Sequence, residues 1–233
     1  MRFETAILSE AGGRLVNQDF AAHRDWCWAL ADGLGGHGGG EHASRIAVEA
    51  VMATCDTQRS PRELVQRANA AVMRAQSEQP SLLQMRTTLV VLVAEDADAR
   101  WAHAGDTRLY HFRGARLRHQ TRDHSFAQTL VEAGRIPPEA IRFHEDRSRL
   151  LRTAGAAECE PEVSEPVPLE ANDAFLLATD GFWELVTERE MEIEYARSGT
   201  AAEWLHRLHL RVNANQQTDR DNLSAIGIFV HAN

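Results

Sequence analysis

Three short apolar runs end at an aspartate beside a glycine, and these aspartates are the strongest chemical signal in the sequence. Residues 28–31 run into Asp32 and Gly33, residues 175–179 into Asp180, and residues 101–105 into Asp106. A strand end holds a carboxylate rigidly at the rim of a sheet, and a neighbouring glycine lets a main-chain carbonyl approach a bound ion. Oxygen ligands of this kind suit hard cations such as Mg²⁺ and Mn²⁺.

Two further polar clusters lie near the ends of the chain. Asp19 belongs to the cluster at 17–19, and Asp221 belongs to the cluster at 219–222. A single Asp-Gly pair more often forms only a turn. Several such ends together favour a metal site, because converging carboxylates repel one another unless they are protonated or neutralised. The sequence leaves open whether these side chains converge.

Other polar motifs have two readings each. The glycine-rich stretch 33–40 could cradle a phosphate at a helix start, or it could be a plain strand-to-helix connection; it matches neither a P-loop nor a dinucleotide fingerprint. His37 and His124 lie beside polar motifs and are candidates either for proton donors or for structural side chains. The pattern lacks a tight histidine pair for zinc and a nucleophilic serine elbow.

Composition excludes several classes of protein. A chain of 233 residues that is 43% hydrophobic is long enough for one domain with a full core, which we expect to span residues 1–233. The net charge of −9 disfavours nucleic acid as a partner. The three scattered cysteines indicate no disulfide framework. The longest apolar run, 89–94, is too short for a membrane span, so we expect a soluble, cytoplasmic protein.

Hydrophobic patterning predicts strands separated by groups of helices. Strands are expected at 26–31, 89–94, 101–104, 109–112, 175–178 and 226–230, with a hairpin at 95–98 and a turn at 113–115. Helices are expected around 46–51, after a capping box at 60–63, and after Thr200. Grouped strands and helices indicate an α+β layered fold.

The order of these motifs resembles the metal-dependent type-2C protein phosphatases in their compact bacterial form. The matching segments span nearly the whole chain in the family's order: RLVNQD at 14–19, ADGLGGH at 31–37, TTL at 87–89, HAGDTR at 103–108, TRDHS at 121–125, ATDG at 178–181 and DNLS at 221–224. Each piece alone is weak, whereas the ordered set is specific to that family.

The resemblance implies a four-layer α-β-β-α sandwich of two antiparallel sheets flanked by helices, with a flap at about 134–149. It implies that Asp32 bridges two Mn²⁺ or Mg²⁺ ions. Asp180 and Asp221 would complete the first site, while Asp19 and the Gly33 carbonyl would serve the second. Asp106 matches the position of a third, weaker ion in some bacterial members.

The implied activity is hydrolysis of phosphoserine and phosphothreonine in proteins by a hydroxide held between two metals. Arg14 would bind the phosphate, so Arg14, Asp32 and Asp180 are the expected catalytic residues. Expected partners are phosphorylated proteins, the substrates of a bacterial Ser/Thr kinase, with the enzyme acting as a monomer. The alternatives are a catalytically silent binding module and a partner-switching phosphatase of an anti-sigma antagonist.

The sequence departs from the family pattern at three positions. Gln18 stands where many members have glutamate, and Arg86 stands where glycine is usual. Leu34 occupies the position of the histidine proposed as general acid in eukaryotic relatives. The last departure leaves the proton donor unassigned while the metal ligands are all present.

Overall fold

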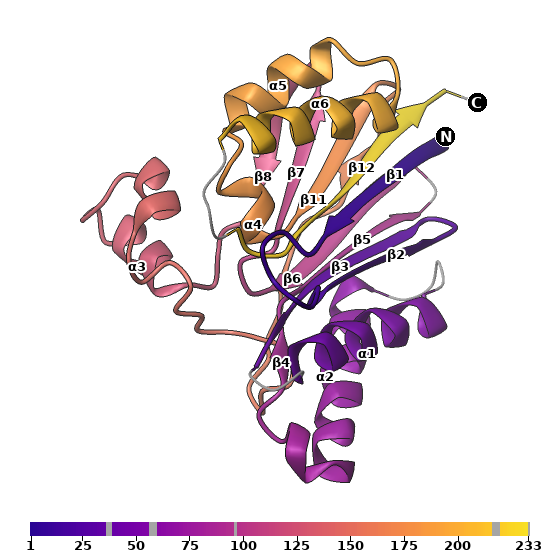
Figure 1. Cartoon of the computed structure of the whole chain (residues 1–233). Coiled ribbons are helices and arrows are strands. Elements are labelled where there is room, and N and C mark those ends of the chain that lie inside the picture. Colours follow the sequence, from indigo (N-terminus) through magenta and orange to yellow (C-terminus); the bar gives the residue numbers. More distant parts are fainter. Residues whose placement is uncertain (36–38, 56–59, 96, 216–219, 233) are drawn as a thin grey trace.

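The computed structural model describes residues 1–35, 39–55, 60–95, 97–215 and 220–232. Within these ranges the strands form two antiparallel sheets (Figure 1). The first sheet has the order β1 (Arg2–Glu10), β12 (Leu223–His231), β11 (Asp173–Ala178), β7 (Arg108–Arg113) and β8 (Arg116–Gln120). The second has the order β10 (Val167–Pro168), β6 (Asp98–Ala104), β5 (Leu89–Glu95), β3 (Cys27–Leu34) and β2 (Asp19–Arg24); β4 (Arg86–Thr87) pairs with β3, and β9 (Glu162–Val163) pairs with β6.

The side chains of each central strand alternate between two apolar layers. In β3, Trp28 and Leu30 enter the layer between the two sheets, whereas Ala29 and Ala31 face a second layer beneath the helices α1 (Gly39–Thr54) and α2 (Pro61–Glu78). This is the two-residue period of an extended chain, and it is why these strands read as continuous apolar runs.

A third apolar layer lies on the outer face of the first sheet. Leu176 of β11 packs there with Trp204 and Leu208 of α6 (Ala201–Ala214), beside α5 (Glu188–Ala196) and the short α4 (Asp180–Trp183). Helices therefore cover both outer faces, as Figure 1 shows. The predicted four-layer α-β-β-α sandwich is confirmed.

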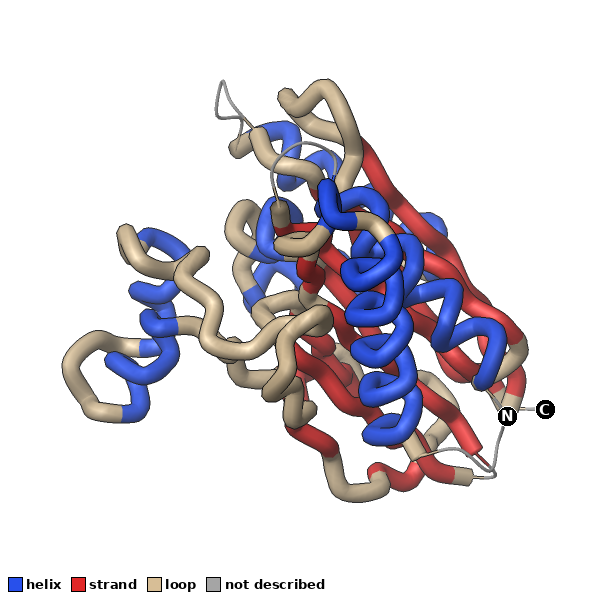
Figure 2. Tube along the Cα trace, turned by 90° about the horizontal axis from the view of Figure 1, so that it is seen from below, coloured by secondary structure: helices blue, strands red, loops and turns tan. Residues whose placement is uncertain are grey.

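Between β8 and β9 the chain leaves the sandwich. This projecting unit contains α3 (Phe126–Glu132) and the 3-10 helix η2 (Pro138–Phe143), and it stands apart from the sheets in both Figure 1 and Figure 2. It begins before residue 134, since α3 belongs to it. The predicted flap at 134–149 covers η2 and the segment that returns to the body; that it moves stays a prediction.

Local sequence signals account for most helix starts. Ser60 accepts a hydrogen bond from the Glu63 amide, and Thr200 accepts one from the Glu203 amide. The reciprocal capping box is found at Thr187 and Glu190, which begin α5, an element that the sequence patterning did not predict. A further 3-10 turn, η1 (Pro80–Leu82), follows α2. Of the helices described, none has the length and apolar character to cross a membrane.

Candidate metal centre

Asp32 lies inside β3, directly opposite Asp19 of β2. The sequence predicted that the strand would end before Asp32. The strand instead continues to Leu34, because Gly33 and Leu34 pair with β4. The Asp32 amide donates to Thr88 Oγ1 at 2.9 Å, and the Asp32 carbonyl accepts from Thr87 Oγ1 at 2.7 Å. These bonds fix the main chain of Asp32, so its carboxylate is held by the sheet itself.

Asp180 and Asp19 are brought together by the end of β11. Asp180 is the first residue of α4, and Thr179 before it donates from Oγ1 to Asp19 Oδ2 at 3.0 Å. Gly181 lets α4 approach the strand that follows Asp221, since a Cβ at Gly181 would lie 2.1 Å from the Asn222 carbonyl oxygen. Four carboxylates from four separate segments thus share the same end of the sandwich.

The pKa values of Asp32, Asp180 and Asp19 are raised, as expected for carboxylates that are buried close to one another. Burial and the negative charges of Asp180, Asp19, Asp106 and Asp221 hold the pKa of Asp32 well above its usual range. Burial, followed by the charges of Glu184, Asp221 and Asp19, raises the pKa of Asp180 to about 7. Burial is also the main reason that the pKa of Asp19 is raised to about 6. These carboxylates favour a proton or a cation between them.

Asp106 occupies the turn between β6 and β7. Burial, with the charges of Asp180 and Asp123, raises its pKa. Trp183, at the end of α4, donates from Nε1 to the Asp106 carbonyl at 3.0 Å, and the Arg108 guanidinium stacks on the Trp183 ring at 3.4 Å from its centroid. The same short helix therefore fixes Asp180 at one end and the Asp106 turn at the other.

Arg14 lies at the mouth of this centre and contacts Asp221. Its Nε and one terminal nitrogen donate to the two Asp221 oxygens at 3.1 and 3.2 Å. A cleft of about 210 Å³ opens here, lined by Arg14, Arg147, Ser148, Asp180, Gly181, Glu184, Leu185, Arg220 and Asp221. Three carboxylates and three arginines line this cleft, so it offers groups for both cations and anions. Asp19, Asp32 and Asp106 are not among its lining residues.

The donor set fits divalent cations. Asp19 Oδ1 is buried and has no hydrogen-bond partner among the described residues, so it is a free ligand atom facing its neighbours' charges. All the donors are oxygens, as Mg²⁺ and Mn²⁺ prefer. The Gly33 carbonyl lies against Gly40 in the close contact between β3 and α1, so its role as a ligand stays a prediction.

A histidine cluster behind Asp106 has a structural role. Ligand atoms of His103, His124 and Glu162 lie within 4.8 Å of one another, but the two imidazole rings stack at 4.5 Å with an angle of 5°. Lone pairs of parallel rings do not converge on one ion. His124 Nδ1 accepts from the Gly105 amide at 3.2 Å, and burial lowers the pKa of His124 to about 3. His124 is therefore a neutral support for the Asp106 turn and a poor proton donor.

Some important neighbours escaped the sequence analysis. Among the charged groups, Glu184 has the largest effect on the pKa of Asp180, and Arg147 of the projecting unit pairs with Glu184. Asn222 accepts from the Gln18 amide and donates to the carbonyls of Ala11 and Val16, which places the loop carrying Arg14. Asn222 lay in a motif already singled out, whereas Glu184 and Arg147 carried no local signal. His37 and Asp219 lie outside the described residues.

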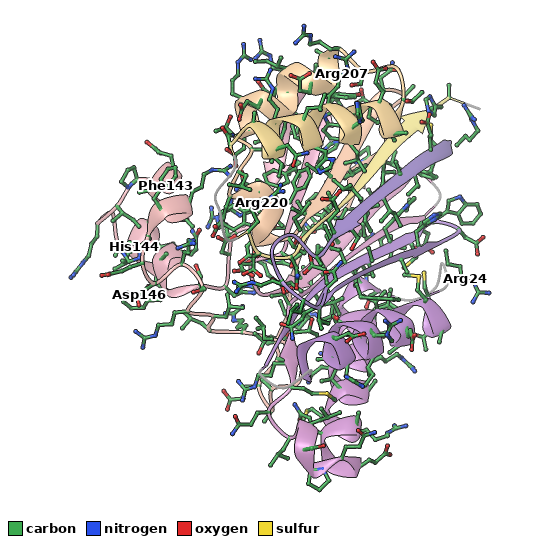
Figure 3. The ribbon with its side chains drawn as sticks, in the orientation of Figure 1. Arg24, Phe143, His144, Asp146, Arg207 and Arg220 are labelled. Atoms are coloured by element: carbon green, nitrogen blue, oxygen red, sulfur yellow. The ribbon has the colours of Figure 1, made fainter. Side chains whose placement is uncertain are left out.

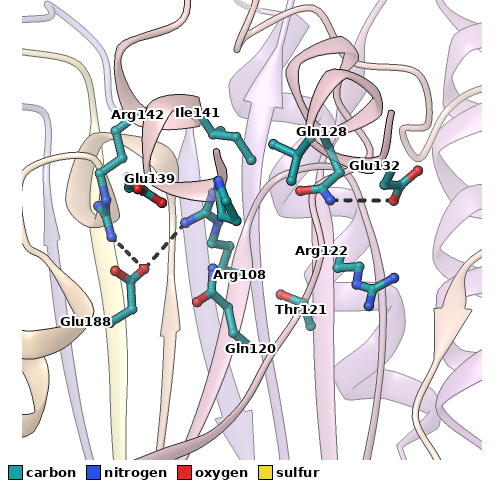
Figure 4. Close-up of a pocket in the computed structure, with 12 residues that line it drawn as sticks. Arg108, Gln120, Thr121, Arg122, Gln128, Glu132, Glu139, Ile141, Arg142 and Glu188 are labelled. Atoms are coloured by element: carbon teal, nitrogen blue, oxygen red, sulfur yellow. Dashed lines mark hydrogen bonds and ion pairs between the residues drawn. The ribbon is translucent and has the colours of Figure 1, made fainter. Parts of the chain in front are cut away.

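A cavity larger than the carboxylate cleft lies elsewhere among the described residues. It has a volume of about 700 Å³ and lies between the projecting unit and the sheet that ends in β8, on the other side of η2 (Figure 4). Arg142 and Arg108 reach Glu188 across it, at 2.6 and 3.8 Å. None of the residues that line it lines the cleft as well.

Comparison with known proteins agrees with this architecture. The family model of protein phosphatase 2C matches residues 9–225, and the chain belongs to that family. The serine/threonine protein phosphatase PstP of Mycobacterium tuberculosis is 36% identical over 187 residues, which cover 77% of this chain and 36% of that protein's length. Protein phosphatase PhpP of Streptococcus pneumoniae is 31% identical over 203 residues, 81% of this chain and 82% of that protein.

A solved structure extends the likeness to nearly the whole chain. The catalytic domain of PstP in complex with two manganese ions superposes with a TM-score of 0.87 at 28% identity, over 99% of each chain. The expected family and fold are thereby confirmed, whereas the roles of individual residues stay predictions.

Proposed function

We propose that this chain hydrolyses phosphoserine and phosphothreonine in proteins, using two divalent cations held by the aspartates that converge beside the carboxylate cleft. The observation that carries this proposal is the convergence of Asp19, Asp32, Asp180 and Asp221, where burial and then the neighbouring negative charges raise the pKa of Asp32 and Asp180. The relatives named as serine/threonine phosphatases, and the relative bound to two manganese ions, support the same assignment.

The aspartates would bind the cations, and the arginines would bind the phosphate. Asp32 would bridge both ions, Asp180 and Asp221 would complete one site, and Asp19 with the Gly33 carbonyl would complete the other. Asp106, whose charge reaches Asp180, suits a third and weaker ion. When bound, the ions supply the positive charge that activates water and neutralises the phosphoryl oxygens.

Arginines would orient the phosphate at the rim. Arg14 carries a fork of donors that fits an oxyanion bidentately, and it already binds Asp221 in that way. No histidine is among the described side chains that line the cleft. We therefore propose that solvent in the open cleft supplies the proton to the leaving serine or threonine oxygen.

The setting of the reaction is part of the proposal. We propose a cytoplasmic, monomeric enzyme that opposes a bacterial Ser/Thr kinase. A silent binding module is not favoured, because each predicted carboxylate ligand is present. A partner-switching phosphatase would use the same centre, and only trials with candidate phosphoproteins separate it from a general one.

The decisive test is hydrolysis of a phosphothreonine peptide with and without metal. Activity should disappear in excess chelator and return with Mn²⁺ or Mg²⁺, and acid quenching should trap no phosphorylated enzyme. Full activity in metal-free protein, or a covalent phosphoenzyme, would contradict the proposal. The same assay in Mn²⁺ and in Mg²⁺ ranks the two ions.

A further inference from the structure

A second hollow adjoins the carboxylate cleft on the side of the projecting unit. Its volume is about 480 Å³, and its lining residues are Arg142, Phe143, Arg147, Glu184, Leu185, Thr187, Glu190 and Asn215. Arg147, Glu184 and Leu185 line both spaces. In a substrate whose phosphate lies in the cleft, residues close to the phosphorylated one can therefore reach this hollow.

Phe143 stands at the outer wall of the hollow and is unusually exposed. Its relative exposure is 82%, while Ile141 and Arg142, just before it in η2, are 3% and 8% exposed. The buried pair packs the end of η2 against its surroundings, and Phe143 lies on the projecting unit (Figure 3). An aromatic side chain left in water on the wall of a hollow that adjoins the cleft is available to contact a bound substrate.

Each charged group that lines the hollow has an oppositely charged partner, either in the lining or just outside it. Arg147 pairs with Glu184, and Arg142 donates to Glu188 at 2.6 Å (Figure 4). Glu190 accepts from the amide and hydroxyl of Thr187, the cap of α5, and forms an ion pair with Arg211 at 3.8 Å. With its charges paired and with Phe143 and Leu185 on its walls, the hollow suits an uncharged, apolar group.

We propose that this hollow is a subsite for an apolar side chain of the phosphoprotein, and that Phe143 determines the preference. The inference rests on the proposed function, because it places the phosphorylated residue in the adjoining cleft. An extended chain advances about 3.3 Å per residue, so the shared wall puts the apolar residue within a few positions of the phosphorylated one. The class of substrate is thus a phosphoserine or phosphothreonine segment with a nearby leucine, methionine or aromatic residue.

The test compares Phe143→Ala and Phe143→Leu with the unmodified protein in Mn²⁺. The substrates are p-nitrophenyl phosphate and two sets of phosphothreonine peptides, with leucine or with aspartate scanned through the three positions on either side. The unmodified protein should favour one leucine position over aspartate by about tenfold in kcat/KM. Phe143→Ala should remove that preference, and Phe143→Leu should keep most of it. Hydrolysis of p-nitrophenyl phosphate should stay unchanged in both variants.

A matched control removes an exposed leucine elsewhere. Leu210, on α6, is 56% exposed and lines neither space, so Leu210→Ala should leave every ratio unchanged. Equal kcat/KM for leucine and aspartate peptides in the unmodified protein would overturn the subsite. An equal loss by Phe143→Ala on all three kinds of substrate would overturn it too. Failure of the unmodified protein on p-nitrophenyl phosphate and on every peptide would instead strike the proposed function.

Discussion

Asp32 is the residue on which the metal centre depends, and its neutral analogue should separate activity from stability. Burial and four like charges already hold its pKa well above the usual range, so metal-free protein keeps a proton on this group at higher pH than normal. Asparagine has nearly the same size and permanently lacks the charge. Repulsion between two carboxylates about 5 Å apart is roughly 3 kcal/mol at an effective dielectric near 20, and proton uptake lowers this to ~1 kcal/mol.

For Asp32→Asn we therefore expect a metal-free melting temperature equal to or slightly above that of the unmodified protein. Turnover should fall by several orders of magnitude, and Mn²⁺ should no longer raise the melting temperature, because only ligands bound tightly to the folded state stabilise it. The control is Asp25→Asn, an exposed turn residue that is not among the charges acting on Asp32. A variant that is less stable in chelator but keeps activity and metal stabilisation would make Asp32 a simple turn carboxylate.

Arg14 gives a second prediction at this scale, because the structure shows it bound to Asp221. Both groups are about half exposed, so this ion pair is worth at most ~1 kcal/mol. In Arg14→Ala, Mn²⁺ affinity should stay the same or tighten by a few-fold, since a competitor for Asp221 is removed. The value of kcat/KM should fall, because the transition state loses roughly 2–3 kcal/mol of binding free energy when the charged bidentate contact to the phosphate is removed.

Calorimetric titration with Mn²⁺ and phosphopeptide kinetics measure the two effects separately. Arg24→Ala is a matched control, because Arg24 also makes an exposed ion pair but lines no part of the cleft. Loss of Mn²⁺ binding in Arg14→Ala would give Arg14 a structural role at the metal centre. Unchanged kinetics would remove it from the site.

At the scale of elements, β3 and α1 touch through two glycines. A Cβ on Gly33 would lie 2.0 Å from the Gly40 carbonyl oxygen, closer than any real contact. Gly33→Ala should therefore separate the strand that carries Asp32 from the helix that follows it. We expect a loss of at least 2–3 kcal/mol in the free energy of unfolding, with weaker Mn²⁺ binding.

Denaturant unfolding of Gly33→Ala and of Gly199→Ala measures this cost. At Gly199 the nearest atom to an added Cβ is Glu203 Oε2 at 3.9 Å, and the backbone has no positive φ, so that variant should change stability little. Equal stability of the two variants would show that the β3–α1 contact yields easily to an extra methyl group.

Elements with continuous apolar runs were predictable, and those with mixed patterns were not. The hairpin of β5 and β6 matches the predicted break, and β11 and β12 match their apolar runs. By contrast, β1 at the edge of its sheet has only exposed and half-buried residues, and its sequence carries no apolar run. The extension of β3 through Asp32 depends on pairing with β4, which lies far along the chain and has no local signature.

The same limit applied to the site. Its carboxylates stood in recognisable Asp-Gly and Gly-Asp motifs, so Asp32, Asp180 and Asp106 could be named in advance. The pairing of Arg147 with Glu184 joins the projecting unit to α4 across 37 positions. Such a contact is fixed by tertiary packing, which composition and periodicity do not encode.

At the scale of the whole molecule, the packed sandwich holds several carboxylates together at one end, and their pKa values are raised. The raised pKa values, about 6 for Asp19 and about 7 for Asp180, with that of Asp32 also raised, mean that the folded metal-free protein binds more protons than the unfolded chain above pH 4. The free energy of unfolding must then fall as pH rises from about 4 to about 7. Allowing for relaxation and for coupling between the groups, the loss is on the order of 2 kcal/mol.

Divalent cations should reverse this dependence. Cations bind the ionised carboxylates, so Mn²⁺ competes with protons and stabilises the fold more at pH 8 than at pH 5. The melting temperature in Mn²⁺ minus that in chelator should be close to zero at pH 5 and widen steadily towards pH 8. Titrating groups far from the centre act equally with and without metal and cancel in this difference. His124 supports the Asp106 turn, but its pKa is lowered to about 3, so it stays neutral from pH 5 to pH 8. Adding Mn²⁺ to weakly buffered protein at pH 6 should also release protons. Asp32→Asn should show neither the widening difference in melting temperature nor the full proton release.

A difference in melting temperature that stays constant from pH 5 to pH 8 would contradict this prediction. It would mean that these carboxylates are already ionised without metal, and that the repulsion inferred from their packing is relieved by some other group.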